Sequence, residues 1–214
     1  FSGINSGNRV YRGISWFILA LGSISIFFTY SRTAWLLSLA ALFLWFGKEL
    51  FTGKRLYLWL GGILFLLNLP WFKARIFRPE NFVESTLGFR TQIWQNTLKI
   101  ITEYWQWGSG PGSFSKVYNS YPTGNGLVQH GHQLYLQLWL ENGLLSLAVF
   151  IKVMVNNLVG FNGFQSTFKA VALVIVIFLA AGFFETWWAH QFCGGYFWLL
   201  IGLLQSLRTG QIDS

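Results

Sequence analysis

The sequence predicts an all-α, polytopic membrane protein, a transmembrane helical bundle with a large extracytoplasmic loop. Two observations predict this class. First, 53% of the 214 residues are hydrophobic and only 10% are charged, whereas a soluble domain carries about 25% charged residues to cover its surface. Second, several stretches reach the roughly 17–25 apolar residues that a helix needs to cross a bilayer. The same composition excludes a soluble monomer and a disordered chain.

Three transmembrane helices are expected within residues 13–72, before the loop. The first covers residues 13–30 and is interrupted only by small polar side chains. The second covers 34–51 and follows a tight corner at 31–33. The third, 56–72, is nearly all Leu, Ile, Phe, Trp and Gly, as expected for a lipid-facing segment.

About three more transmembrane helices are expected within residues 132–207. One covers 132–155, another is a clean hydrophobic run over 168–184, and a shorter one covers 195–207. We expect a single membrane domain over residues 1–214. We also expect it to be the C-terminal part of a longer protein, because it opens without Met and without a signal-peptide pattern.

Basic residues in the short loops predict how the chain is threaded, because lysine and arginine favour the cytoplasmic side. They lie before the first span, between the second and third, around the loop after the fourth, and after the last: Arg9, Arg12, Lys48, Lys54, Arg55, Lys152, Lys169 and Arg208. This alternation fits six helices with both ends in the cytoplasm. We then expect a multi-pass membrane protein whose loop at 73–131 lies outside, on the periplasmic face in a Gram-negative cell.

The periplasmic loop is expected to contain an amphipathic helix over residues 87–107. At 100° per residue its Gln, Asn and Lys side chains share one face, and Ile93, Trp94 and Ile101 share the other. Arg90 lies in the middle of this apolar face. It is either an arginine that snorkels at the membrane interface or a ligand for an anion near the helix N-terminus.

Other basic residues are candidates for anion binding. A net charge of +8 favours membrane lipid headgroups or an anionic substrate, and we expect no nucleic-acid partner. Arg32 lies in the corner between two spans, where anchor and ligand are equally plausible roles. Arg75, Arg78 and Lys116 are secondary candidates. The glycine-rich turn at 108–112 offers bare backbone N–H groups, although an ordinary turn explains it as well.

Two histidines open the fourth span, and a polar stripe follows them. His130 and His132 are candidate general bases, since histidine titrates near neutral pH; an interfacial pair without chemistry is the alternative. Gln133, Gln137 and Glu141 are spaced i, i+4, i+8. Such a stripe is costly in lipid, so we expect it to face protein or water.

The sequence offers little for a metal ion. Its single cysteine and single aspartate, Cys193 and Asp213, exclude a disulfide scaffold, an all-cysteine site and a DxD site. No third ligand accompanies the two histidines. We therefore expect no metal site and no cofactor.

Four motifs occur in an order that resembles the O-antigen ligase and O-antigen polymerase family of the bacterial inner membrane. They are Tyr30-Ser-Arg-Thr-Ala-Trp35, Gly88-Phe-Arg90 followed by Trp94, Gly108-Ser-Gly-Pro-Gly-Ser-Phe114, and the run from His130 to Leu145. The resemblance covers roughly residues 15–150. Gln133 and Ser146 stand where Asn and Gly are usual. These differences weaken the assignment to a subfamily more than the resemblance to the family.

The resemblance implies metal-independent transfer of a glycan from an undecaprenyl-diphosphate carrier at the periplasmic face. The acceptor would be the lipid A core, as in lipopolysaccharide biosynthesis, or a carrier-linked glycan. Arg32 and Arg90 would hold the diphosphate and His132 would be the base. The substrate-binding residues would be Lys116, Arg78, Arg75, His130 and Glu141. A transporter related to bicarbonate carriers and a non-catalytic membrane subunit are the alternatives. Gly and Pro breaks at the loop side, not mid-span, favour the enzyme.

Overall fold

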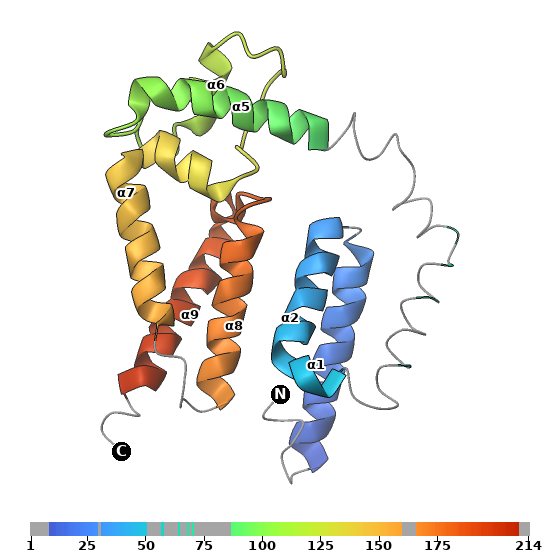
Figure 1. Ribbon diagram of the computed structural model, residues 1–214. Coiled ribbons are helices and arrows are strands. Elements are labelled where there is room, and N and C mark those ends of the chain that lie inside the picture. The colour runs from blue at the N-terminus through green and yellow to red at the C-terminus, as the bar shows by residue number, and fades with distance from the viewer. Residues whose placement is uncertain are drawn as a thin grey trace. The chain divides into compact units, whose positions relative to one another are not determined.

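A computed structural model of the chain describes residues 9–29, 31–50, 87–159 and 166–209, and the single positions 57, 64, 68 and 70. These described stretches are helical and contain no strand, as Figure 1 shows. The all-α class is therefore confirmed for this part of the chain. Most of the expected third span, and both Arg75 and Arg78, lie outside the described residues.

The chain divides into two units. The first comprises Phe1–Trp45, Met154–Ala181 and Gln191–Ser214, and the second comprises Phe46–Val153 and Gly182–His190. The second unit holds the amphipathic helix, the two adjacent histidines and the glycine-rich turn, so most candidate site residues belong to one unit.

In the first unit, α1 (Arg9–Phe28) and α2 (Arg32–Leu50) are joined by a short corner. The Ser31 hydroxyl accepts a hydrogen bond from the Ala34 N–H at 3.2 Å and so caps the start of α2. The Trp35 indole N–H donates to the Ile26 carbonyl at 3.0 Å, across the corner. A tight corner is thus present and is closed by a side-chain contact, but it lies before residue 32, because Arg32 and Thr33 already belong to α2.

The other two helices of the first unit, α8 (Ser166–Ala181) and α9 (Gln191–Thr209), pack against each other. Their buried side chains are apolar: Phe168, Val171, Ala172, Ile175, Phe197, Ile201 and Leu204. The Phe178 and Phe197 rings lie 5.8 Å apart, centroid to centroid. The sixth expected helix is therefore longer than the predicted 195–207.

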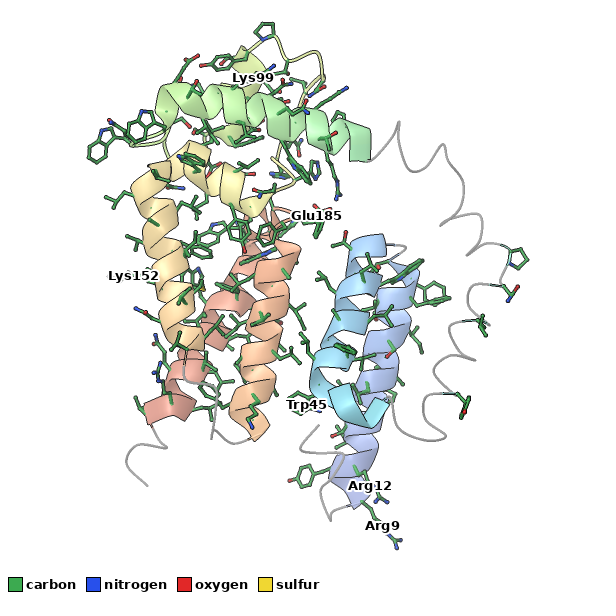
Figure 2. The ribbon with its side chains drawn as sticks, viewed as in Figure 1. Arg9, Arg12, Trp45, Lys99, Lys152 and Glu185 are labelled. Carbon is green, nitrogen blue, oxygen red and sulfur yellow. The ribbon has the colours of Figure 1, made fainter. Side chains whose placement is uncertain are left out.

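The core of the second unit lies between α5 (Leu87–Tyr104), α6 (Phe114–Ser120) and the first part of α7 (Leu134–Leu158). It consists of Ile93, Ile100, Ile101, Phe114, Tyr118, Val128 and Leu140. The predicted amphipathic helix is confirmed as α5, although it ends at Tyr104. Figure 2 shows Lys99 and Glu185 on opposite sides of it.

α7 bends at Gly143, whose φ of 80° and ψ of 170° are not helical, and Figure 1 shows the bend. The continuous span predicted at 132–155 is wrong in this respect. The segment before Gly143 carries the polar stripe and joins the core with α5, whereas the segment after it is mostly apolar. The stripe therefore faces protein.

The bend arises where the turn after α5 crosses α7. A Cβ on Gly143 would lie 2.1 Å from the Gln106 carbonyl oxygen, and one on Gly108 would lie 2.4 Å from the Glu141 carbonyl oxygen. Both glycines have positive φ, which only glycine adopts without strain. Two glycines thus let two backbones meet, which periodicity along one helix cannot predict.

Several helices suit a membrane. Among the described residues, Arg9–Phe28 and Leu134–Leu158 are long and apolar enough to cross one, by length and composition. Thr33–Trp45 and Thr167–Ala181 are shorter apolar helices. Large apolar side chains are exposed on them, including Phe17, Leu36, Phe43, Leu145 and Val149. A soluble protein rarely exposes so much apolar surface. The number of spans and the side of the loop stay predictions.

Candidate functional site

Arg90 lies in the first turn of α5 and reaches a turn that follows α8. Its Nη1 donates to the Phe184 carbonyl oxygen at 2.9 Å, and its Nη2 forms an ion pair with Glu185 Oε1. The arginine side chain is 18% exposed. In the structure the arginine is thus paired with Glu185, and its role as a ligand for a substrate anion stays a prediction.

Glu185 is the site residue that sequence reasoning missed. It lies in the turn 182–190, which contains the 3-10 helix η2 (Trp187–Ala189). The turn is tied to the start of α7, because the Leu134 N–H donates to the Gly182 carbonyl at 2.7 Å. One signal was available: carboxylates are few outside the expected spans, and this one opens the run Glu-Thr-Trp-Trp-Ala-His.

His132 brings a second partner to the same carboxylate. Its Nδ1 lies 3.4 Å from Glu185 Oε2, and its side chain is 33% exposed. Its φ of 48° places it in the left-handed region, which is uncommon for a non-glycine residue. Backbone strain of this kind tends to occur at functional sites.

The turn before α7 holds His132 in that conformation. The Gly131 N–H donates to Gln137 Oε1 at 2.9 Å, and Gln133 Oε1 accepts from the Leu136 N–H in the first turn of α7. A Cβ on Gly131 would lie 3.0 Å from the Phe114 ring. The predicted stripe therefore fixes the backbone on both sides of the histidine.

The shared carboxylate sets the chemistry of the imidazole. Burial raises the pKa of Glu185, but the hydrogen bond from His132 and the charge of Arg90 outweigh it and leave that pKa below its ordinary value of 4.5. Glu185 is thus a carboxylate near neutral pH and can only accept. His132 Nδ1 then carries the proton in this contact.

His130 lies beside a third histidine. Its ring centroid is 6.2 Å from that of His190. Burial lowers the pKa of His130, and the neighbouring His190 and His132 lower it further. His190 therefore also borders the candidate site.

Backbone N–H groups of the glycine-rich turn and the residues after it donate to the Glu141 carboxylate. This carboxylate accepts from the Gly112 N–H at 3.1 Å, the Phe114 N–H at 3.2 Å and Gln137 Nε2 at 3.0 Å. The Gly110 N–H donates to the Glu141 carbonyl at 2.8 Å. These contacts give Glu141 a structural role. They also occupy backbone N–H groups that the sequence analysis considered as ligands for an anion.

Comparison with known proteins decides the family. The sequence matches the O-antigen ligase family over residues 17–151. The chain belongs to the O-antigen ligase family. No curated protein and no solved structure matches the chain.

Membership of the O-antigen ligase family assigns glycosyltransferase-type activity on lipid-linked glycans, at a membrane. The matched stretch contains Arg32, Arg90, His130 and His132, and it ends before Glu185. The carboxylate that joins Arg90 to His132 therefore comes from the part of the chain that the family match does not cover.

Two further candidates belong to α2 and α6. Arg32 is the first residue of α2, in the first unit, and its side chain lies outside the described residues. Lys116 is exposed on α6. Within the described ranges, no group of three or more His, Cys, Asp or Glu residues is suited to a metal ion.

Two buried polar atoms next to the candidate site have no hydrogen-bond partner within the part of the chain that the structure describes. They are Trp94 Nε1, one helical turn after Arg90, and Thr186 Oγ1, in the residue after Glu185. Thr186 is 5% exposed. Buried polar groups are normally paired, so these two atoms are exceptions.

Proposed function

We propose that Arg90, His132 and Glu185 form the centre that transfers a glycan from an undecaprenyl-diphosphate carrier to an acceptor hydroxyl at the periplasmic face. One observation carries this proposal: an arginine and a histidine from separate segments share one carboxylate. A fixed cation for a diphosphate and an oriented imidazole for a proton are what this transfer requires.

Arg90 supplies the cation. An arginine binds phosphate oxygens through charge-assisted hydrogen bonds, often two at once. It also stabilises the charge that develops on the diphosphate as the sugar leaves. Arg32 is proposed as a second ligand, on the resemblance at the helix corner.

His132 supplies the base. The acceptor oxygen bonds to the anomeric carbon of the donor sugar as the bond from that carbon to the phosphate oxygen breaks. The electron pair leaves with the diphosphate, and His132 Nε2 takes the acceptor proton. Glu185 is a positioning residue, because it holds Nδ1–H and stabilises the imidazolium that forms. Side chains fill each of these roles, so the proposed reaction is independent of a metal ion.

The acceptor is proposed to be the lipid A core or a second carrier-linked glycan. Trp94 Nε1 and Thr186 Oγ1 are donors without partners among the described residues. Uncharged donors suit sugar hydroxyl oxygens, whereas the cation suits the diphosphate.

The test measures glycan transfer and donor binding separately, in reconstituted full-length protein. His132→Ala should lower turnover about 10²–10⁴-fold and leave donor binding in place. Arg90→Ala should weaken both, and Arg90→Lys should recover only part, because lysine lacks the planar fork. His130→Ala is the matched control and should be milder than His132→Ala. Transfer at the wild-type rate by His132→Ala would exclude His132 as the general base.

A further inference from the structure

We propose that Glu185 and the donor diphosphate compete for Arg90, and that donor binding releases this carboxylate from Arg90 and leaves it to His132. The inference rests on the proposed function, and it adds a sequence of events. His132 would be fully oriented as a base only when a diphosphate has replaced Glu185 as the partner of Arg90.

The first support is that the two oxygens of the Glu185 carboxylate contact different partners. Glu185 Oε1 pairs with Arg90 Nη2, and Glu185 Oε2 faces His132 Nδ1 at 3.4 Å. The arginine's second contact is the neutral Phe184 carbonyl oxygen, at 2.9 Å. One negative charge is therefore shared by two partners, and the imidazole has the longer contact.

The second support is exposure. The Arg90 side chain is 18% exposed, whereas that of Glu185 is 44% exposed. A largely buried guanidinium, which cannot lose its proton, needs an anion nearby. The carboxylate that provides it is open to solvent, so its hold on the arginine is weakened by screening. A diphosphate carries more charge and can meet the planar fork through two oxygens.

Comparison with Glu141 supports exchange at Glu185 in particular. The Glu141 carboxylate accepts from two backbone N–H groups and from a neighbouring glutamine. These donors belong to the framework of the turn, and a ligand would have to break the turn to reach them. The partners of Glu185 are side chains of the proposed site, so its contacts can change while the fold stays.

The exchange is tested by binding of undecaprenyl diphosphate to the full-length protein in lipid nanodiscs. Glu185→Gln keeps the shape of the side chain but removes the charge that competes for Arg90. Undecaprenyl diphosphate should then bind about two- to five-fold more tightly, as expected for loss of a solvent-screened ion pair. Turnover should fall about tenfold or more, because the imidazole loses its carboxylate. Weaker or unchanged binding would overturn the proposal.

A double-mutant cycle separates exchange from simple repulsion. In an Arg90→Ala background, Glu185→Gln should no longer tighten binding, because the contact that the diphosphate must displace is already absent. The same tightening in both backgrounds would show that Glu185 merely repels the anion, and would refute the exchange. Glu103→Gln is the charge-matched control, since Glu103 is an exposed carboxylate on α5 that accepts from the Tyr121 hydroxyl. It should change neither quantity.

Two results distinguish failure of the exchange from failure of the proposed function. If Arg90→Ala does not weaken binding of undecaprenyl diphosphate, the proposed function fails. If it does weaken binding while Glu185→Gln does not tighten it, only the exchange fails. Should Glu185→Gln not fold, Glu185→Asp serves instead. Because the aspartate side chain is shorter, Glu185→Asp should tighten binding of undecaprenyl diphosphate less than Glu185→Gln and should retain part of the turnover. A Glu185→Asp protein with neither tighter binding nor residual turnover would contradict the proposal.

Discussion

His132 adopts a φ of 48°, and this conformation places its Nδ1 within 3.4 Å of Glu185. The contact with Glu185 and the strained backbone of His132 are thus parts of one arrangement. Strain of this kind costs about 1–3 kcal/mol and persists only where the surroundings fix it. Here the surroundings are Gly131, whose N–H is bound by Gln137, and the capped start of α7.

His130 gives a prediction about pH. Its pKa is lowered from the ordinary value of 6.5 by burial, then by His190 and His132, while Glu141 and Glu185 oppose the shift. The folded protein therefore favours neutral His130, and this stability is present above about pH 6.5 and is lost as the pH falls. We expect Tm to decrease from about pH 7.5 to about pH 5.5, and to decrease less in His130→Gln. Thermal unfolding at both pH values checks this.

An equal decrease in the variant and the wild type would assign the acid sensitivity elsewhere. Glu185 does not interfere in this window. Its pKa is lowered from 4.5, so its contribution is present above that value and is lost only at still lower pH.

At the scale of elements, the second unit depends on how the turn after α5 meets α7. The Ser109 N–H donates to the Leu140 carbonyl at 2.8 Å, and the Leu144 N–H donates to the Trp105 carbonyl at 2.9 Å. These bonds satisfy backbone groups that the bend removes from the helical ladder. The bend is therefore a joint between two elements and is hydrogen-bonded on both sides.

Gly143→Ala tests this joint. Its Cβ would lie 2.1 Å from the Gln106 carbonyl oxygen, in addition to the strain of a φ of 80°. We expect a loss of roughly 3 kcal/mol or more, since backbone cannot move aside as a side chain can. Gly124→Ala is the matched control, because Gly124 also has positive φ but a Cβ there meets nothing within 4 Å. It should lose only about 1 kcal/mol.

Thermal unfolding and size-exclusion chromatography of both glycine variants measure the difference. Equal losses would mean that the positive φ alone matters at Gly143. The close approach of the turn would then contribute nothing measurable.

Glu141→Leu tests what holds the glycine-rich turn. The change leaves the Gly112 and Phe114 N–H groups without the carboxylate that now accepts from them. An unsatisfied polar group costs about 1–3 kcal/mol. We therefore expect a lower Tm and faster proteolysis near Pro111. Glu141→Gln keeps an accepting oxygen and should lie between this variant and the wild type. Unchanged protease sensitivity in Glu141→Leu would show that the turn is held by its other contacts.

At the scale of the whole molecule, family membership and apolar helix surfaces agree on a membrane protein. The basic loops then predict the side of each segment. We expect residues 73–131 to be periplasmic and 48–55 to be cytoplasmic, because lysine and arginine alternate along the short loops.

Cysteine labelling in intact cells checks this topology. In a Cys193→Ala background, Gln95→Cys on the exposed face of α5 should react with a membrane-impermeant maleimide. Thr52→Cys should react only after the membrane is permeabilised. Equal labelling of the two positions in intact cells would overturn the arrangement.

The sequence by itself determined the class, the family and most helices. Low charge and long apolar runs are properties of composition, which a membrane requires whatever the packing. The amphipathic helix with Arg90 on its buried side also followed from a local period. His132 was found from its motif, because the family resemblance is carried by contiguous residues.

Only the tertiary structure decided which residues share a site. Glu185 reaches Arg90 and His132 through a turn that follows α8, and no local period relates these positions. The bend at Gly143, and the capture of the glycine-rich turn by Glu141, likewise depend on one backbone crossing another. The physical reason is that helix periodicity fixes the face of a side chain within its own helix, whereas its partner is fixed by packing between distant segments.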